Sequence, residues 1–415
     1  MPRRSLFAPA VAGVAFCAPL CPAQWTQWGG PQRDFQIAAP ARLVENWGED
    51  GPKVLWKRAL GAGYSAILVD GDRLYTMMRR GDDDVVLCLK AADGETIWER
   101  PYSAPPKPDM QLEFGPGPHS TPVLTADRLF CVSATVILNA VEKSSGKILW
   151  TKDLMAELGA SHMGRGYGPS PLIYRDLLIL PVGGKQTGVA AFKQDSGELV
   201  WKTPPMRGCQ ASPRIVRIHD EDHLVASMGT DRLALDPATG EIRWSIKADD
   251  QSAAIMASPC FIAPDYVFFS AAYGGGSDLI KVLRDGGKYS AEVTWHSAKM
   301  KVHHQTIVSR NGYVYGSSGD FGPAFLAAVE LETGKVTGRL RDFAKCNLLL
   351  AGDKLIVLDE EGWLALAKPE SDGINVVSKA KLLQDKAWTV PTLVGTKLYL
   401  RDTHDIMAVD LGAEG

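Results

Sequence analysis

The sequence predicts an all-β fold: an eight-bladed β-propeller of four-stranded antiparallel blades, closed by an N-terminal strand that completes the last blade. Three observations predict it. A unit that ends in tryptophan recurs along the chain, eight segments open with the same pattern, and the last unit is one strand short. A closed ring of blades leaves only short, protected strand edges. The strand that the last blade lacks is therefore expected to come from the N-terminal end of the chain.

The recurring unit ends with a strand, a glycine-centred turn and a second strand that carries a tryptophan. Its best copies are VLCLKAADGETIW, LNAVEKSSGKILW, VAAFKQDSGELVW and LALDPATGEIRW. Repeats of about 40 to 50 residues are typical of propeller blades. A tryptophan ring buries about 150 to 250 Å², so we expect these rings to pack one blade against the next rather than to contact a ligand. They are Trp56, Trp98, Trp150, Trp201, Trp244 and Trp295.

Each unit opens with a small or polar residue, a short apolar strand, a turn and a second apolar strand. The eight openings span residues 65–77, 120–132, 169–180, 211–226, 257–270, 305–316, 347–358 and 389–400. Each unit has room for four short strands with polar turns between them, and no segment shows a sustained helical period. This spacing predicts eight blades.

The two ends of the propeller are expected to meet. The last unit has three strands, whereas the orphan strand KVLWKRAL around Trp56 precedes the first unit. We therefore predict that this N-terminal strand completes the eighth blade, and that residues 53–411 form a single propeller domain. Residues 24–52 are interpreted as an N-terminal extension.

The first 23 residues have the pattern of a secretory signal peptide. Arg3 and Arg4 precede a short apolar run, and Cys21-Pro22-Ala23 offers a small-residue exit. The large residues before Cys17 and Cys21 disfavour a lipid anchor. No other segment approaches the roughly 20 apolar residues of a transmembrane helix. We expect an exported protein of the periplasm or cell envelope, without a transmembrane segment.

Composition excludes several classes of partner and site. The chain has 45 Lys and Arg against 48 Asp and Glu, a formal net charge of −3, and no basic block. Nucleic acid is therefore not expected as a partner. The five cysteines beyond the leader have no pairing or metal-ligand spacing, which argues against a disulfide framework. Cys88 and Cys131 lie in apolar strand patterns and are interpreted as small buried hydrophobes.

The blade ending, with its Gly-x-x-x-Trp pattern, resembles the PQQ-like repeat. That repeat is shared by quinoprotein alcohol dehydrogenases and by the propeller lipoprotein of the outer-membrane barrel-assembly machinery. The segments WTQWGGPQRD, FGPGPHSTP and LYLRD, together with the pair His303-His304, resemble exported PQQ-like proteins of planctomycete-type bacteria. The resemblance implies a quinoprotein-like propeller and leaves its activity open, because function lies in sites rather than folds.

The resemblance to dehydrogenases implies PQQ and Ca²⁺ as candidate cofactors. Those enzymes use adjacent cysteines beside the quinone and a carboxylate and Asn set around the calcium ion. This chain has no adjacent cysteines and no acidic cluster with calcium-ligand spacing. We therefore expect neither cofactor, and no metal.

The loops that lead into the innermost strands are expected to meet at one mouth of the central channel. They carry Tyr64, His119, Tyr167, Cys209-Gln210, Met256, His303-His304, Cys346-Asn347, Trp388, Arg401 and His404. From these we select six residues as candidates for binding a small polar or anionic ligand. They are His119, Tyr167, His303, His304, Trp388 and Arg401. The alternative is that the histidines only cap strand ends.

Two further expectations concern chemistry at this mouth. Adjacent residues of a strand point to opposite faces, so His303 and His304 are not expected to share a metal ion. Neither a Gly-x-Ser-x-Gly motif nor an identifiable nucleophile–base pair is present. The first hypothesis is thus a non-enzymatic binding or scaffold protein, a monomer with an envelope protein as partner. The alternative is a ligand-binding or enzymatic propeller, with a PQQ-dependent dehydrogenase ranked last.

Overall fold

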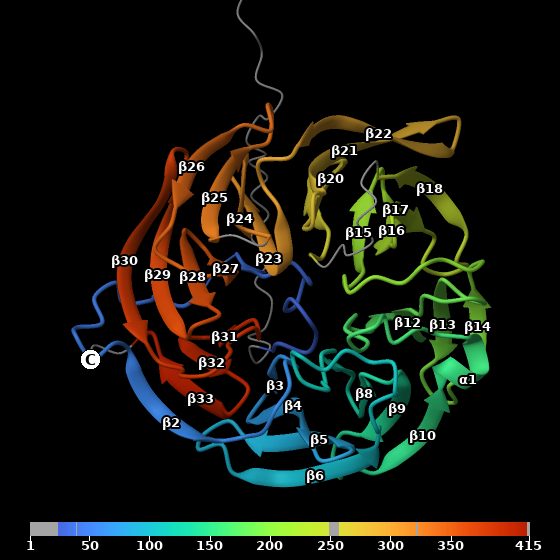
Figure 1. The fold of residues 1–415 in the computed structure, drawn as a ribbon, viewed down its shortest axis with the longest axis horizontal. Coiled ribbons are helices and arrows are strands. Elements are labelled where there is room, and N and C mark those ends of the chain that lie inside the picture. Colours follow the sequence, from blue (N-terminus) through green and yellow to red (C-terminus); the bar gives the residue numbers. More distant parts are fainter. Residues whose placement is uncertain (1–23, 39, 249–256, 321–322, 413–415) are drawn as a thin grey trace, which may run out of the picture.

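The strands of this chain surround a central axis as eight sheets, which Figure 1 shows as a ring of blades. The computed structural model describes residues 24–38, 40–248, 257–320 and 323–412. The predicted signal peptide, residues 1–23, lies outside the described residues. Every blade contains four antiparallel strands, so the predicted eight-bladed, four-stranded architecture is confirmed.

The first four blades follow one another along the chain, and the next three continue the same order. Blade 1 consists of β3 (Leu68–Asp70), β4 (Arg73–Arg80), β5 (Asp83–Lys90) and β6 (Thr96–Ser103), and blade 2 of β7 (Val123–Leu124), β8 (Arg128–Val132), β9 (Ile137–Glu142) and β10 (Ile148–Asp153). Blade 3 consists of β11 (Leu172–Tyr174), β12 (Leu177–Pro181), β13 (Val189–Lys193) and β14 (Leu199–Lys202), and blade 4 of β15 (Arg214–Ile218), β16 (Glu221–Met228), β17 (Asp231–Leu235) and β18 (Ile242–Lys247). Blade 5 consists of β19 (Cys260–Ile262), β20 (Tyr266–Ala271), β21 (Gly276–Asp285) and β22 (Lys288–Ser297). Blade 6 consists of β23 (Val302–Arg310), β24 (Tyr313–Ser318), β25 (Phe325–Glu330) and β26 (Val336–Leu340), and blade 7 of β27 (Cys346–Ala351), β28 (Lys354–Asp359), β29 (Trp363–Glu370) and β30 (Gly373–Lys381).

The eighth blade joins the two ends of the chain. It contains β31 (Thr392–Val394), β32 (Lys397–Arg401) and β33 (Asp405–Asp410), with β2 (Lys53–Ala59) as its outermost strand. β2 pairs antiparallel with β33, and Trp56 lies opposite Ala408. The predicted closure by the N-terminal strand is therefore confirmed.

In the described part of the chain, one short helix interrupts the strands. The helix α1 (Leu154–Leu158) begins after Asp153, whose side chain accepts a hydrogen bond from the amide of Ala156, and ends at Gly159 in a left-handed conformation. Among the described residues, no helix has the length and apolar composition needed to cross a membrane.

The outer rim is built from a repeated contact between tryptophan and glycine. The ring of Trp56 lies over Gly94 in the turn of the next blade, where a Cβ atom would come within 2.7 Å of the ring. The indole N–H of Trp56 also donates to the carbonyl of Ala91, at 3.1 Å. Gly94 has a φ of 74°, so the turn needs glycine both for its backbone and for the ring above it.

Four further tryptophans repeat this contact in other blades. The pairs are Trp98 over Gly146, Trp150 over Gly197, Trp201 over Gly240 and Trp295 over Gly334. Trp244 differs, because the hairpin β21–β22 of the next blade is longer than its counterparts. Its ring is buried in an apolar cluster that includes Val267 and Ile280 of blade 5. All six tryptophans thus lie where one blade meets the next.

The N-terminal segment fills one end of the central channel. Trp25 forms a bridge with Val69 in blade 1, and the amide of Leu124 in blade 2 donates to the carbonyl of Thr26. The short strand β1 (Gln36–Ile37) then pairs in parallel with β27, the innermost strand of blade 7. Figure 1 shows this dark blue segment inside the ring. We call residues 24–37 the plug.

Arg33 fixes the plug to the opposite side of the ring. Its guanidinium donates to the carbonyls of Ser170, Pro171 and Pro213, in the openings of blades 3 and 4. Next to it, Asp34 forms an ion pair with Arg214 at 3.2 Å. The plug therefore ties together blades that are far apart in the sequence.

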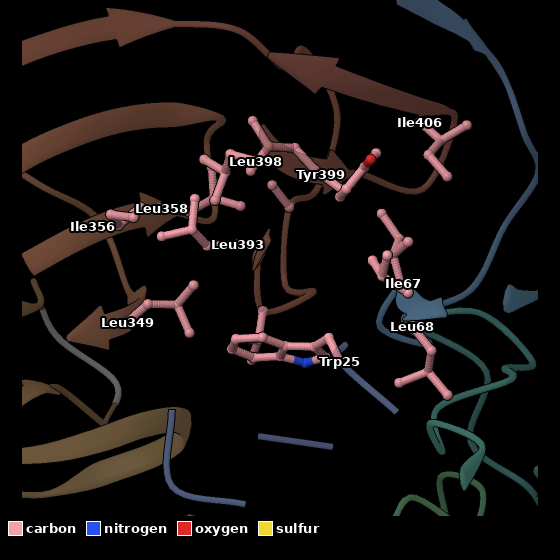
Figure 2. Close-up of a cluster of buried hydrophobic side chains, with 14 of the residues drawn as sticks. Trp25, Ile67, Leu68, Leu349, Ile356, Leu358, Leu393, Leu398, Tyr399 and Ile406 are labelled. Carbon is pink, nitrogen blue, oxygen red and sulfur yellow. The ribbon is translucent and has the colours of Figure 1, made fainter. Parts of the chain in front are cut away.

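Trp25 lies in the largest apolar cluster of the molecule. Figure 2 shows its ring facing Leu68 of blade 1, Leu349 of blade 7 and Leu393 of blade 8. The ring also covers Gly30, where a Cβ atom would come within 2.9 Å of it. Glycine at this position allows the plug to turn back over its own tryptophan.

Candidate functional site

A large pocket opens at the mouth of the channel opposite the plug. Its volume is about 1560 Å³. Trp28 of the plug lines the pocket, and its indole N–H donates to the hydroxyl of Ser258 in blade 5, at 3.3 Å. The plug therefore forms the floor of the pocket, and the channel is accessible from the loop face.

Six aromatic and imidazole rings form a continuous arc along one wall of the pocket. In order they are His119, Tyr64, Trp388, His304, His303 and Tyr273, and successive ring centroids are 5.6, 5.2, 4.6, 5.0 and 4.7 Å apart. They come from blades 2, 1, 8, 6 and 5. We call this set the ring arc. It exists only because the propeller closes and brings these blades together.

Each histidine of the ring arc has a distinct hydrogen-bond setting. The Nε2–H of His119 donates to the carbonyl of Arg165, at 3.0 Å. The Nε2 atom of His304 accepts from the side-chain amide of Gln305, at 2.8 Å. His303 is 8% exposed, and neither of its ring nitrogens has a hydrogen-bond partner within the described residues. His303 therefore lines the pocket while both of its ring nitrogens are buried and unpaired within the described residues.

Burial keeps these imidazoles neutral. It lowers the pKa of His119 and of His303 to about 4, and it lowers the pKa of His304 well below its ordinary value. The nearby Lys345 lowers the pKa of His303 and of His304 further. A neutral imidazole has one donor and one acceptor nitrogen, so the wall presents polar but uncharged groups to the pocket.

Glycine-rich loops border the ring arc at His119. Gly166 approaches His119 so closely that a Cβ atom there would lie 2.8 Å from the imidazole ring. The side-chain amide of Gln210 donates to the carbonyl of Gly166, at 2.8 Å. The absence of a side chain at Gly166 thus allows this loop to pack directly against the His119 end of the ring arc.

Most carboxylates at the pocket are already paired. Asp320 accepts from Lys301 at 3.0 Å and from the amide of Tyr273 at 2.7 Å. Asp109 lies 3.1 Å from His162. Within the described part of the chain, no group of three or more His, Cys, Asp and Glu side chains has the arrangement of a metal site.

Reactive side chains at the pocket do not form a catalytic pair. No serine, threonine or cysteine side chain among the described residues forms a hydrogen bond with His119 or His304. The Nε2 atom of His119 bonds to a carbonyl, and that of His304 bonds to a side-chain amide. The five cysteines of the described chain are free and buried, and burial raises the pKa of Cys209 to about 12 and that of Cys260 to about 11. Deprotonated thiols are therefore disfavoured here.

Four of the six candidate residues chosen from the sequence converge on the pocket, namely His119, His303, His304 and Trp388. The structure places the other two elsewhere. Tyr167 is fully buried, and its hydroxyl donates to the carbonyl of Pro181 at 2.9 Å. Arg401 is also fully buried and donates to the carbonyls of Gly61, Ser65 and Met77, which joins blade 8 to blade 1. Neither residue reaches a ligand in the pocket, so both leave the candidate set.

The two adjacent histidines differ from expectation. Instead of facing opposite sides of a regular strand, His303 and His304 both line the pocket. The cause is an irregularity in β23, whose pairing with β24 shifts between Val302 and Ile307. A regular alternation of side chains does not apply within such a shift.

Among the aromatic residues of the pocket, Trp28, Phe114 and Tyr273 were not identified as candidates from the sequence. Trp28 lies in the N-terminal extension, and Phe114 lies in a proline-rich insertion between two blades. The glycines after Trp28 were a signal that this segment turns sharply, but its destination depends on the ring. Met256, in another loop that was expected at the mouth, lies outside the described residues.

Comparisons with known proteins agree on one architecture. A family model described as outer membrane protein assembly factor BamB matches residues 82–337. Two curated proteins of that name, from Moranella endobia and Yersinia pestis, are 22% and 20% identical over 302 and 300 residues. Each alignment covers 68% of this chain and 72% of the relative.

Solved structures show the same fold. BamB from Moraxella catarrhalis superposes with a TM-score of 0.61 at 16% identity, over 85% of this chain and 97% of that one. Quinohemoprotein alcohol dehydrogenase from Comamonas testosteroni gives 0.67 at 10% identity, over 95% and 81%. A europium-containing methanol dehydrogenase gives 0.68 at 11% identity, over 91% and 89%. At these identities the structures establish the architecture alone.

Proposed function

Because this chain belongs to the PQQ-like β-propeller family described as outer membrane protein assembly factor BamB, we propose that it is a non-enzymatic binding protein of the cell envelope. In this proposal the exported protein is a monomer and holds a protein partner at its pocket face. The curated relatives are named as assembly factors, which supports a role in bringing other envelope proteins together.

One observation carries the proposal: a loop that lines the pocket through Phe114 exposes two large apolar side chains. Leu112 is 43% exposed and Phe114 is 42% exposed. The other strongly exposed large apolar residues lie on outer strands such as β2, β10 and β14. Exposed apolar side chains beside a concave surface are typical of protein contact sites.

The loop around these residues is held in place before any partner binds. The hydroxyl of Tyr64 donates to the carbonyl of Phe114, at 2.8 Å. Arg165 forms an ion pair with Glu113 at 2.9 Å, and its guanidinium lies 5.1 Å from the centre of the Phe114 ring. A preordered loop loses little conformational entropy on binding, which favours recognition.

The residues of the pocket do not fit the cofactors of the dehydrogenases. Adjacent cysteines are absent from the sequence. Asp320 is engaged by Lys301 and by backbone amides, and the residues described contain no cluster that could hold Ca²⁺. We propose accordingly that the protein acts without PQQ or calcium.

Site-specific photo-crosslinking tests the protein partner. A crosslinking amino acid at position 112 should trap a discrete envelope protein in living cells. The same amino acid at position 293 provides a matched control, because Val293 is 45% exposed but lies on an outer strand of blade 5. Equal adducts at both positions, or none at position 112, would contradict the proposal.

Substitution at the same loop tests the contact energetically. We expect Leu112→Asp to abolish co-purification of the trapped protein while the free energy of unfolding changes by less than about 0.5 kcal/mol, because Leu112 is a surface residue. Val293→Asp should retain the partner. Fractionation of the untagged protein checks the location, since recovery in the cytoplasm would contradict export.

A further inference from the structure

We propose that the pocket beneath this loop is a carbohydrate site, which takes an oligosaccharide of several linked sugar rings. This goes beyond the protein contact proposed above, which uses the exposed loop around Leu112 and Phe114 rather than the interior of the pocket. The inference depends on the shape of the pocket, on the ring arc and on the neutral polar groups between the rings.

The size of the pocket favours a ligand larger than a typical small molecule. Small-molecule pockets usually have volumes of about 300 to 1,000 Å³, whereas this one has about 1560 Å³. Trp28 and the plug close its floor, so a ligand enters and leaves by the same mouth. The pocket therefore fits the end of a chain or a branch of several units.

The ring arc supplies flat apolar surfaces. Tyr64 and Trp388 are partly exposed in the pocket wall, with their ring centroids 5.2 Å apart and their planes tilted by 35°. An aromatic face carries negative charge density, and the C–H groups on one face of a pyranose ring are weakly positive. Two neighbouring rings at an angle can thus contact two successive sugar units.

The polar groups of the arc match hydroxyls better than ions. A hydroxyl both donates and accepts a hydrogen bond, and so does a neutral imidazole. His303 has both nitrogens without a partner in the described chain and is more than nine-tenths buried beside the pocket. His119 uses only Nε2 for the carbonyl of Arg165, which leaves Nδ1 as an acceptor.

The charged side chains argue against an organic cation as ligand. Asp320 and Asp109 already have partners, and Arg165 is paired with Glu113. Lys345 remains on the wall as a cation that forms no ion pair with a carboxylate among the described residues. We therefore expect a sugar with an acidic group to bind more tightly than its neutral counterpart.

Isothermal titration calorimetry of the full-length protein tests the site. The probes are chitotetraose, maltotetraose and tetragalacturonic acid, with a tetrapeptide of glycine and phenylalanine as the alternative occupant. We expect at least one sugar to bind with a dissociation constant of about 1 mM or tighter. If none binds at millimolar concentration, or if only the peptide binds, the carbohydrate site is refuted.

Variants locate the binding within the pocket. Tyr64→Ala and His303→Gln should each weaken the sugar by about tenfold or more. The matched controls Tyr174→Ala and His219→Gln change residues outside the pocket and should bind as the parent protein does. Unchanged affinity in both folded pocket variants would overturn the proposal. Because Leu112→Asp should leave sugar affinity intact, failure of the protein contact and failure of the sugar site remain distinguishable.

Discussion

The outer rim and the ring arc both use aromatic side chains, but they use them in opposite ways. At the rim, one contact is repeated: a tryptophan such as Trp98 lies on a glycine such as Gly146, and its N–H is satisfied by a carbonyl. In the pocket, each ring occurs once. There, His303 is buried without a hydrogen-bond partner in the described residues.

This difference suggests a division of roles: the aromatic residues of the outer rim stabilise the fold, and those of the ring arc bind a ligand. The repeated contact, in which Trp56, Trp98, Trp150 and Trp295 also donate to a carbonyl, stabilises the ring of blades. A buried polar group without a partner instead costs free energy of folding. Sites that bind ligands commonly accept such a cost. Rim substitutions should therefore lower stability and pocket substitutions should mainly lower affinity, and the following predictions test that division.

The largest effect is expected from Trp98→Ala at the rim. The substitution removes the ring above Gly146 and a hydrogen bond to the carbonyl of Lys143. We expect the free energy of unfolding to fall by about 3 kcal/mol. Trp388→Ala should cost only about 1 kcal/mol, because the vacated space opens into the pocket rather than forming a closed cavity. Urea denaturation measures both, and equal losses would contradict the division.

Arg33→Met tests whether a residue that occurs once can still act structurally. The change leaves the carbonyls of Ser170, Pro171 and Pro213 without their donor. Each unsatisfied carbonyl is costly, and we expect a total loss of about 3 kcal/mol.

The control for the plug is Arg217→Met, because the side chain of Arg217 is 63% exposed and forms only a surface ion pair. It should cost less than about 0.5 kcal/mol. Thermal unfolding compares the two variants. Similar melting temperatures would show that the plug contributes little to closure of the ring.

Gly146→Ala separates the two reasons for glycine at the rim. Gly146 has a φ of 73° and lies under the Trp98 ring, whereas Gly71 has a φ of 63° with open space around it. Gly71→Ala should therefore cost about 1 kcal/mol for backbone strain alone. Gly146→Ala should cost about 2 kcal/mol or more, because its Cβ also displaces the ring. Equal losses in the free energy of unfolding for the two variants, measured by chemical denaturation, would mean that the Trp98 ring moves aside at no cost.

The last prediction concerns acid and the pocket. His303 has a pKa of about 4 in the folded protein and an ordinary value of 6.5, so the unfolded chain binds the proton more readily. Stability contributed by neutral His303 is present above about pH 6.5 and is lost as the pH falls toward 4, at no more than about 1.4 kcal/mol per pH unit.

Removing the imidazole should reveal that slope. His303→Gln should lose stability less steeply between pH 7 and pH 5 than the parent protein, as measured by urea midpoints. Trp98→Ala removes no titrating group. The free energy of unfolding of this variant should therefore depend on pH in parallel with that of the parent protein. A parallel line for His303→Gln would show that the imidazole does not titrate with unfolding.

Much of the fold is predictable because its signals are local and repeated. The turn glycines, the tryptophans one strand later and the missing strand of the last unit identify eight blades and their closure. The candidate site is only partly predictable. His119 and Trp388 could be placed at the channel mouth from their position before an innermost strand. The same rule also selected Tyr167, whose side chain is fully buried outside the pocket.

Long-range packing explains the differences. Arg401 lies in a motif that looked suited to an anionic ligand, yet the closed ring puts backbone carbonyls of blade 1 around its guanidinium. The plug is a second case. Its sequence shows a sharp turn, but its contacts with blades 1, 2, 3, 4, 5 and 7 require all of those blades to be in place.

The sequence alone determined the repeat, the number of blades and the way the ring closes, because backbone φ at Gly94 and the apolar alternation of each strand act over a few residues. Tertiary structure alone decided that the channel is closed at one end by Trp25 and Arg33 and that six rings meet at the other. The physical reason is that these contacts join positions up to hundreds of residues apart, and only the completed ring brings them within reach.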